Sequence, residues 1–379
     1  MRTVSGMTSV PMSAPAVGPA ELALVSKAIE TGWISSRGQF LTDFEEAFAR
    51  YVRGGQGIAT TSGTTALHLA LAALRIGPGD EVVVPDFTMI ACANAVLYCG
   101  ATPIFGDVDP TTWTLDPADL ERKITRRTRA VMPVHIYGHP ADMDPIRRIA
   151  RTHGLSVVED AAEAHGALYR GRSVGGLGTA GCFSFYSNKI ITTGEGGMVV
   201  TQSKAVAGRA RRLRDLAFAH ATRDYRHSEL AFNYRMTNVQ AAIGLAQLRR
   251  IDEFIEHRRA CARIYADLLG DIDGVTLPAE APWARNVYWM YTVLIPGGVT
   301  SRARIIRRLA SEGIESRVAF WPLHRQAFLR KGKGAKGRFP IADDLSRRGL
   351  SLPSGNGITE TMVAEAAQTL KRVLREDAR

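Results

Sequence analysis

Three short segments of the sequence carry side chains that could act together in catalysis. The first, TTSGTTALHLAL, places Ser62, Gly63, Thr64 and Thr65 at a turn that leads into a predicted helix. The free backbone N–H groups, the hydroxyls and the helix dipole at such an N-terminus can hold a phosphate group. An ordinary helix cap would use the same residue types, so this segment alone leaves both interpretations open.

The other two segments end predicted strands. Asp160 closes the strand SVVED, and Lys189 follows the strand CFSFYS and one asparagine. Sheet enzymes present functional groups at the carboxyl ends of their strands. For each residue alone, a helix-capping aspartate and a lone surface lysine are the simpler interpretations. The neighbouring Glu159 should point to the opposite face, because side chains alternate along a strand.

A phosphate pocket, a strand-end carboxylate and a strand-end lysine are together what pyridoxal 5′-phosphate (PLP) chemistry requires. The lysine amine forms a Schiff base, the carboxylate keeps the ring nitrogen protonated, and the phosphate anchors the cofactor. The glycine-rich segment ITTGEGG behind Lys189 suits a backbone that passes close to a bound group. We therefore predict a PLP enzyme.

Other motifs are weaker. Residues 176–181, GLGTAG, match the GxGxxG pattern of dinucleotide sites, but they run into the strand CFSFYS where that fold needs a helix. The glycine-rich loop 332–337 lacks the GK[ST] ending of a P-loop. The nine histidines form no HxH or HExxH signature, so we expect no metal.

The elements that must position these residues follow an α/β pattern. Short apolar runs such as EVVVP, ATPIF, SVVED and GMVVT alternate with helical segments, which predicts a mostly parallel sheet between helices. We expect an N-terminal segment and a large α/β domain over residues 1–250. A helix over 237–269 should bridge to a smaller C-terminal α+β domain, so that the second domain covers residues 251–379.

Composition limits the partners and the compartment. The 48 basic and 37 acidic residues give a net charge of +11 spread along the chain, which favours an anionic small substrate over a nucleic acid. Four cysteines without CxxC spacing and an N-terminus without an apolar signal segment predict a cytoplasmic protein. The uncharged stretch 87–106 should divide into a helix and a strand, and we expect no membrane partner.

An ordered series of segments extends these predictions over nearly the whole chain: GWISSRGQ, SGTTALHLAL, VPDFTMIACANAV, GATPIFGDVDP, VEDAAEAHGA, FSFYSNKIITTGEGG and FNYRMTNVQAAIGLAQL. The series resembles the sugar aminotransferases typified by DegT, DnrJ, EryC and StrS, a branch of the fold type I PLP enzymes. The resemblance implies transamination of a nucleotide-linked keto-deoxysugar with L-glutamate as donor, and the chain is most similar to members that aminate GDP-4-keto-6-deoxymannose. The alternatives are transamination of another nucleotide-linked 3- or 4-keto sugar or of an aminocyclitol ketone, and a PLP-dependent sugar dehydratase reaction.

The resemblance also assigns roles to residues. Lys189 matches the Schiff-base lysine and acid/base, Asp160 the partner of the ring nitrogen, and Glu163 a position near the ring hydroxyl where many members have Gln. Asn233 matches a residue that reaches the phosphate from the neighbouring subunit, which implies a homodimer with shared active sites. The expected phosphate ligands are Gly63, Thr64, Thr65 and Ser184. The expected substrate contacts are Trp33, Ser35, Arg235, Arg317 and His324.

Two positions distinguish this chain from other members. Met89 lies where the family usually stacks an aromatic ring on PLP, and a thioether can lie against such a ring. Related sugar dehydratases carry His in place of the Schiff-base lysine. Because Lys189 is present here, the resemblance favours transamination.

Overall fold

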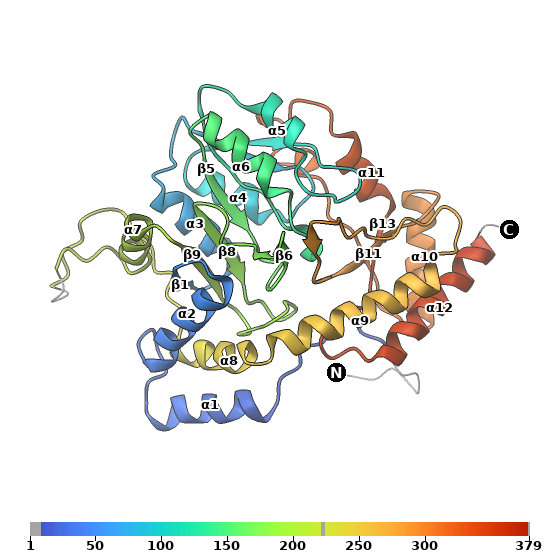
Figure 1. Cartoon of the computed structure of the whole chain (residues 1–379), viewed down its shortest axis with the longest axis horizontal. Coiled ribbons are helices and arrows are strands. Elements are labelled where there is room, and N and C mark those ends of the chain that lie inside the picture. Colours follow the sequence, from blue (N-terminus) through green and yellow to red (C-terminus); the bar gives the residue numbers. More distant parts are fainter. Residues whose placement is uncertain (1–8, 221–223, 378–379) are drawn as a thin grey trace.

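The computed structural model describes residues 9–220 and 224–377, and a seven-stranded sheet lies at its centre (Figure 1). In spatial order the strands are β1 (Gln56–Thr60), β9 (Gly197–Thr201), β8 (Ala180–Ser184), β5 (Ser156–Asp160), β4 (Thr128–Val131), β2 (Glu81–Pro85) and β3 (Thr102–Gly106). The pairs from β8 to β3 are all parallel, whereas β9 is antiparallel to both β1 and β8. The predicted mostly parallel sheet is therefore confirmed.

Helices cover this sheet, and its strands are almost entirely buried. Burial on both faces explains the unbroken apolar runs, such as Val82–Val84, that the sequence shows. The helices between the strands are α3 (Gly63–Ala73), α4 (Ala91–Tyr98), α5 (Pro117–Lys123), η1 (Ile136–Gly138), α6 (Met143–Thr152) and α7 (Lys204–Arg214). The uncharged stretch 87–106 divides into α4 and β3 as expected. Across the described ranges, every helix is too short or too polar to span a bilayer.

The bridging segment consists of two helices. Helix α8 (Asn238–Leu248) packs against the N-terminal helices α1 (Pro19–Glu30) and α2 (Gln39–Val52), and α9 (Ile251–Leu269) continues toward the C-terminal part (Figure 1). The predicted single helix is interrupted because Arg250 leaves the helical region, with φ −112° and ψ 7°. Ile251 and Ile255 are buried where α9 begins.

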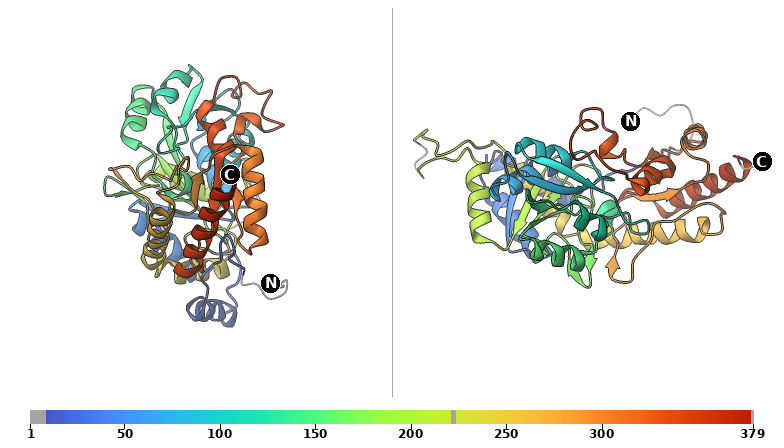
Figure 2. Two further views of the ribbon diagram at one scale, coloured as in Figure 1. Left: turned by 90° about the vertical axis from the view of Figure 1, so that its right-hand side faces the viewer. Right: turned by 90° about the horizontal axis from the view of Figure 1, so that it is seen from above.

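The C-terminal part is built on a second, antiparallel sheet of β11 (Tyr291–Leu294), β13 (Gly349–Leu352) and β12 (Arg317–Val318). Around it lie α10 (Val299–Ser311), η2 (Leu323–Arg325), α11 (Pro340–Arg348) and α12 (Glu360–Asp377), which packs along α9 (Figure 2). A third small sheet, of β10 (Ala284–Arg285), β6 (Leu168–Tyr169) and β7 (Arg172–Ser173), joins residues from the two parts.

Most of the buried hydrophobic residues in the described ranges belong to two clusters. The larger surrounds the seven-stranded sheet, and the smaller lies between α9, α10, α12 and the second sheet. Val10 from the N-terminal segment belongs to the smaller cluster, whereas Trp289 and Leu345 belong to the larger one. The division into residues 1–250 and 251–379 stays a prediction, since each cluster draws on both ranges.

Candidate active site

A cavity of about 440 Å³ lies at the carboxyl ends of β5 and β8 and the N-terminus of α3. Its other wall comes from the C-terminal part of the chain. It is lined by Ser62, Gly63, Thr64, Leu67, Met89, Ala91, Tyr137, Asp160, Ala162, Glu163, Ser184, Tyr186, Asn188, Lys189, Glu195, Trp289, Met290, Arg317, Val318, Phe320 and Ser351. The two strand-end residues and the helix N-terminus predicted to act together therefore share one cavity.

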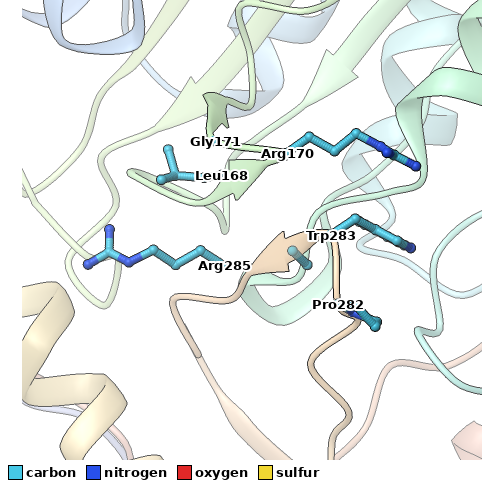
Figure 3. A pocket seen from close by; sticks show the side chains of 7 residues that line it. Leu168, Arg170, Gly171, Pro282, Trp283 and Arg285 are labelled. Atoms are coloured by element: carbon cyan, nitrogen blue, oxygen red, sulfur yellow. The ribbon is translucent and has the colours of Figure 1, made fainter.

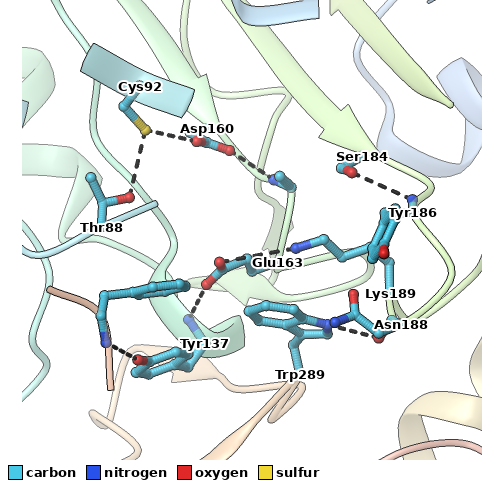
Figure 4. A network of polar contacts seen from close by, with 12 residues as sticks. Thr88, Cys92, Tyr137, Asp160, Glu163, Ser184, Tyr186, Asn188, Lys189 and Trp289 are labelled. Carbon is cyan, nitrogen blue, oxygen red and sulfur yellow. Dashed lines mark hydrogen bonds and ion pairs between the residues drawn. The ribbon is translucent and has the colours of Figure 1, made fainter. Parts of the chain in front are cut away.

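Lys189 extends its amine into this cavity from the loop after β8 (Figure 4). The Nζ atom lies 4.0 Å from Oε1 of Glu163 and 3.5 Å from the centre of the Trp289 ring. Burial lowers the pKa of Lys189, and the carboxylate of Glu163 opposes this shift. A lowered pKa leaves more of the amine neutral, which is the form that can act as a nucleophile or a base.

Asp160 is held at the end of β5 by two donors (Figure 4). The Sγ atom of Cys92 donates to its Oδ2 at 3.0 Å, and the backbone N–H of Ala162 donates to its Oδ1 at 3.0 Å. Burial raises the pKa of the Cys92 thiol well above its usual range, so the thiol stays protonated and can donate. The two donors therefore hold the carboxylate oxygens of Asp160 in place at the cavity wall.

Glu163 contacts the backbone on the opposite wall. Its Oε2 accepts the N–H of Tyr137 at 2.8 Å, and burial raises its pKa to about 7 while the charge of Lys189 lowers it. The ring of Tyr137 stacks on Phe320, with centroids 5.2 Å apart and planes at 14°. This aromatic stack forms the wall between the two parts of the chain.

The N-terminus of α3 provides an anion cradle. Ser62 caps the helix, because its Oγ accepts the N–H of Thr65 at 3.2 Å while the Thr65 hydroxyl accepts the N–H of Ser62 at 2.9 Å. The amides of Gly63 and Thr64 have no carbonyl within the helix to bond. A Cβ on Gly63 would lie 2.7 Å from the Cβ of Ser184, so only glycine lets these two segments approach.

The cradle, the strand-end carboxylate and the lysine amine fit PLP. Gly63, Thr64 and Ser184 would hold its phosphate, Asp160 its ring nitrogen and Lys189 its aldehyde carbon. The hydroxyl of Thr65, expected as a phosphate ligand, belongs to the helix cap and is absent from the cavity wall.

The predicted ring-stacking residue Met89 and the predicted substrate contacts are spread over a wider region than the residues described above. Met89 and Arg317 line the cavity, and both are exposed at its rim. Trp33 and Ser35 are exposed in the loop after α1, and their carbonyls accept hydrogen bonds from Asn238 at 2.7 and 2.6 Å.

Asn233 and Arg235 lie outside the cavity wall, in the excursion between α7 and α8. Asn233 is exposed and forms a β-bridge with Asp215, and Arg235 forms an ion pair with the same aspartate. Neither residue reaches the cavity of its own chain.

His324, predicted as a substrate contact, lies beside two carboxylates of its own chain. Its Nδ1 lies 2.6 Å from Oδ2 of Asp86, its backbone N–H donates to Oδ1 of Asp86 at 2.8 Å, and its Nε2 lies 3.5 Å from Asp343. The ring also stacks on Phe339 at 4.7 Å. Because both ring nitrogens face carboxylates of the same chain, His324 ties the end of β2 to the C-terminal part.

The GLGTAG loop binds an anion of its own chain. Glu159 points away from the side of Asp160, as predicted, and its Oε1 accepts the N–H groups of Leu177 and Gly178 at 2.7 and 2.5 Å. Its Oε2 accepts the N–H of Gly175 at 2.7 Å and lies 3.1 Å from Nε2 of His135. The amides of Leu177 and Gly178 therefore already donate to Glu159.

A second hollow of about 520 Å³ lies between the β6–β7 hairpin and β10 (Figure 3). Its two arginines are both paired with carboxylates, Arg170 with Asp144 at 3.1 Å and Arg285 with Glu256. Trp283 is the aromatic residue in its wall. This hollow lacks the acid, base and nucleophile that distinguish the first cavity.

Sequence reasoning missed Cys92, Tyr137 and Trp289. Cys92 lies in an apolar helix, and Tyr137 and Trp289 belong to apolar segments that indicate core packing. No local pattern distinguishes them from core residues.

Comparison with known proteins identifies the family of this site. The model of the DegT/DnrJ/EryC1/StrS aminotransferase family matches residues 15–371. The GDP-perosamine synthases of Caulobacter vibrioides and Escherichia coli O157:H7 are 47% and 40% identical, covering 98% and 96% of this chain and 100% and 98% of their own. The solved structure of S. venezuelae DesV, in complex with a ketimine intermediate, matches with a TM-score of 0.88 and 36% identity over 95% of this chain and 94% of its own.

These matches confirm the predicted resemblance and the predicted fold class. They span nearly the full length of the chain and of each relative, and they agree with the cavity geometry that fits PLP. The chain belongs to the DegT/DnrJ/EryC1/StrS aminotransferase family, and its cofactor is pyridoxal 5′-phosphate.

Proposed function

We propose that this aminotransferase acts on the ketone of a nucleotide-linked deoxysugar, GDP-4-keto-6-deoxymannose, and takes the amino group from L-glutamate. The observation that carries the proposal is the joint presence of Lys189, Asp160 and Glu163 in one cavity. The substrate is supported by the 47% identity to a GDP-perosamine synthase over 98% of the chain. The presence of Lys189, where related dehydratases have His, supports transamination.

The cofactor, when bound, supplies an electron sink for the donor carbanion and carries the amino group between the two substrates. The chain's own residues do the rest. Asp160 keeps the ring nitrogen protonated, and the cradle of Gly63, Thr64 and Ser184 anchors the phosphate. Lys189 Nζ removes the proton from Cα of the donor, and burial favours the neutral amine that this step needs. The position that stacks on the cofactor ring carries Met89 instead of an aromatic residue, so the thioether of Met89 would lie against the cofactor face.

Arg317 is our proposed carboxylate or diphosphate contact at the cavity rim. A planar guanidinium matches both groups with paired hydrogen bonds, and Arg317 is exposed at a wall of the cavity. Trp33 and Ser35 stay proposed contacts of the nucleotide sugar. His324 is not among these proposed contacts, because Asp86 bonds its Nδ1 and the carboxylate of Asp343 lies 3.5 Å from its Nε2.

We also propose a cytoplasmic homodimer. The excursion that carries Asn233 and Arg235 projects away from the sheet (Figure 1), and its residues Tyr225 and Leu230 are 85% and 90% exposed. Apolar side chains this exposed suit an interface, through which Asn233 would reach the partner's phosphate. All four cysteines are unpaired, which suits a reducing compartment.

The substrate is tested with enzyme converted to its pyridoxamine 5′-phosphate form. A panel of GDP-, dTDP- and UDP-linked 3- and 4-keto sugars is presented, and return of the visible absorbance of bound PLP is followed with product analysis. We expect GDP-4-keto-6-deoxymannose to react and to yield an amino sugar. Reaction with a non-nucleotide ketone alone would disprove the substrate, and a deoxygenated product without an amino group would indicate a dehydratase.

The role of Lys189 is tested separately. Borohydride treatment of the purified enzyme, followed by peptide mass spectrometry, should find the reduced cofactor on Lys189. Lys189→Ala should keep the fold and bind PLP without a covalent link. A lysine adduct in that variant would contradict the assignment.

A further inference from the structure

Side chains from the C-terminal part hold the backbone on both sides of Lys189. The indole Nε1 of Trp289 donates to the carbonyl of Asn188 at 2.9 Å, as Figure 4 shows. The side-chain Nδ2 of Asn356 donates to the carbonyl of Ile190 at 2.7 Å. The residues immediately before and after the lysine are therefore fixed by two separate hydrogen bonds.

One buried guanidinium organises both of these donors. Arg258, in α9, is 2% exposed, and its Nη1 donates to the backbone carbonyl of Trp289 at 2.7 Å. Its Nε donates to Oδ1 of Asn356 at 2.7 Å, which leaves the amide nitrogen of that residue to bond beside Lys189. Nη1 also donates to the carbonyl of Ser354 at 3.1 Å. All three acceptors are uncharged oxygens, and no carboxylate in the described ranges pairs with this guanidinium.

We propose that Arg258 is a positioning residue for Lys189, because it orients Trp289 and Asn356 and thereby fixes the two carbonyls that flank the lysine. The inference rests on the proposed role of Lys189. An arginine suits this task because its rigid planar fork reaches several acceptors at fixed angles. A lysine at this position would keep the charge but could not reproduce the fork.

The charge of Arg258 has a second effect. The charged groups that act on Lys189 are the carboxylates of Glu163 and Asp160, which raise its pKa, and Arg258, which lowers it together with burial. His165 also lies near, but burial lowers its pKa to about 3, so it is neutral. Removing the guanidinium should therefore make the Lys189 amine more basic.

The test uses full-length enzyme with Arg258→Met, Arg258→Lys and a control, Arg259→Met. Arg259 is the adjacent arginine of α9, and it bonds Glu280 and the carbonyl of Asn286 instead. One readout is the single-turnover rate with L-glutamate. The other is the pH dependence of Lys189 acetylation by acetic anhydride, measured by peptide mass spectrometry in the pyridoxamine 5′-phosphate form.

We expect Arg258→Met to slow the single turnover by about 100-fold, because a small displacement of a reacting group costs this much, and to move the acetylation midpoint to higher pH. Arg258→Lys should be slow as well, with a midpoint near that of the wild type. The Arg259→Met control should change neither readout.

A milder variant keeps the inference testable if Arg258→Met fails to fold. Asn356→Leu removes one of the two flanking bonds and leaves the charge in place, so we expect a rate about tenfold lower and an unchanged midpoint. A wild-type rate in Arg258→Lys or in Asn356→Leu would overturn the inference. Failure to find the cofactor on Lys189 of the wild type would instead disprove the proposed function.

Discussion

Replacing Glu163 by glutamine should make the amine of Lys189 markedly less basic. The two charged atoms are 4.0 Å apart, and both side chains are nearly inaccessible to solvent. At an effective dielectric constant of about 20, opposite unit charges at this distance attract by about 4 kcal/mol, which corresponds to about 3 pH units. A carboxylate stabilises the ammonium form, so its loss lowers the pKa of Lys189.

The effect should depend on pH in a defined direction. Burial raises the pKa of Glu163 to about 7, so the wild-type carboxyl is increasingly protonated below this pH and then attracts the lysine less. The difference between wild type and Glu163→Gln should thus be largest above pH 7. The calculated 3 pH units are therefore an upper limit, and we expect a displacement of about 1 to 3.

The assay is the pH dependence of Lys189 acetylation in the pyridoxamine 5′-phosphate form. Glu195→Gln is the matched control, because Glu195 lines the same cavity but is exposed and is not among the groups that shift Lys189. We expect the midpoint to move to lower pH in Glu163→Gln and to stay in place in Glu195→Gln. An unchanged or raised midpoint in Glu163→Gln would refute the electrostatic reasoning.

Three further predictions concern the surroundings of the cofactor site. Cys92→Ala removes a donor from the buried carboxylate of Asp160 and should lower the free energy of unfolding of the cofactor-free protein by about 1 to 2 kcal/mol in urea titrations, whereas Cys92→Ser should not. Gly63→Ala puts a Cβ 2.7 Å from a side chain of β8 and should weaken PLP binding at least about tenfold in equilibrium titrations, while Gly18→Ala, with nothing within 4 Å, should have no effect. Glu159→Gln replaces one of the two carboxylate oxygens that accept the loop N–H groups by an amide donor and should cost about 3 to 5 kcal/mol of stability, and a loss below about 1 kcal/mol would contradict this interpretation.

Sequence analysis could predict the site residues whose positions depend on local secondary structure. Asp160 ends one strand and Lys189 follows another, and neighbouring parallel strands end at one edge of the sheet, so their meeting in one cavity follows from the pattern. The two interpretations of the α3 N-terminus turned out to be compatible. Ser62 caps the helix with Thr65, and the same cap leaves the next amides free at the cavity wall.

The residues that the sequence could not predict reach the site through tertiary structure. Trp289 is 100 residues away from Lys189 along the chain, and Arg258 is buried in an amphipathic helix whose other arginines face solvent or carboxylates. Their roles depend on how α9 and the loop before β11 pack against the large sheet. Hydrophobic periodicity predicts that such segments are buried, but it does not specify which backbone carbonyl a buried donor will meet.

The adjacent acids Glu159 and Asp160 show that a glycine-rich motif can indicate an anion without identifying it. A glycine-rich loop such as GLGTAG exposes several amides and therefore indicates an anion, but the pattern does not say which anion. Here the anion is Glu159, one residue before the carboxylate that faces the cofactor cavity. Because alternate side chains of β5 point to opposite faces, the same strand end supplies one carboxylate to the fold and the other to the site. The amides that donate to Glu159 also anchor the end of β5. The position of Asp160 therefore depends on hydrogen bonds that Glu159 makes on the opposite face of the sheet.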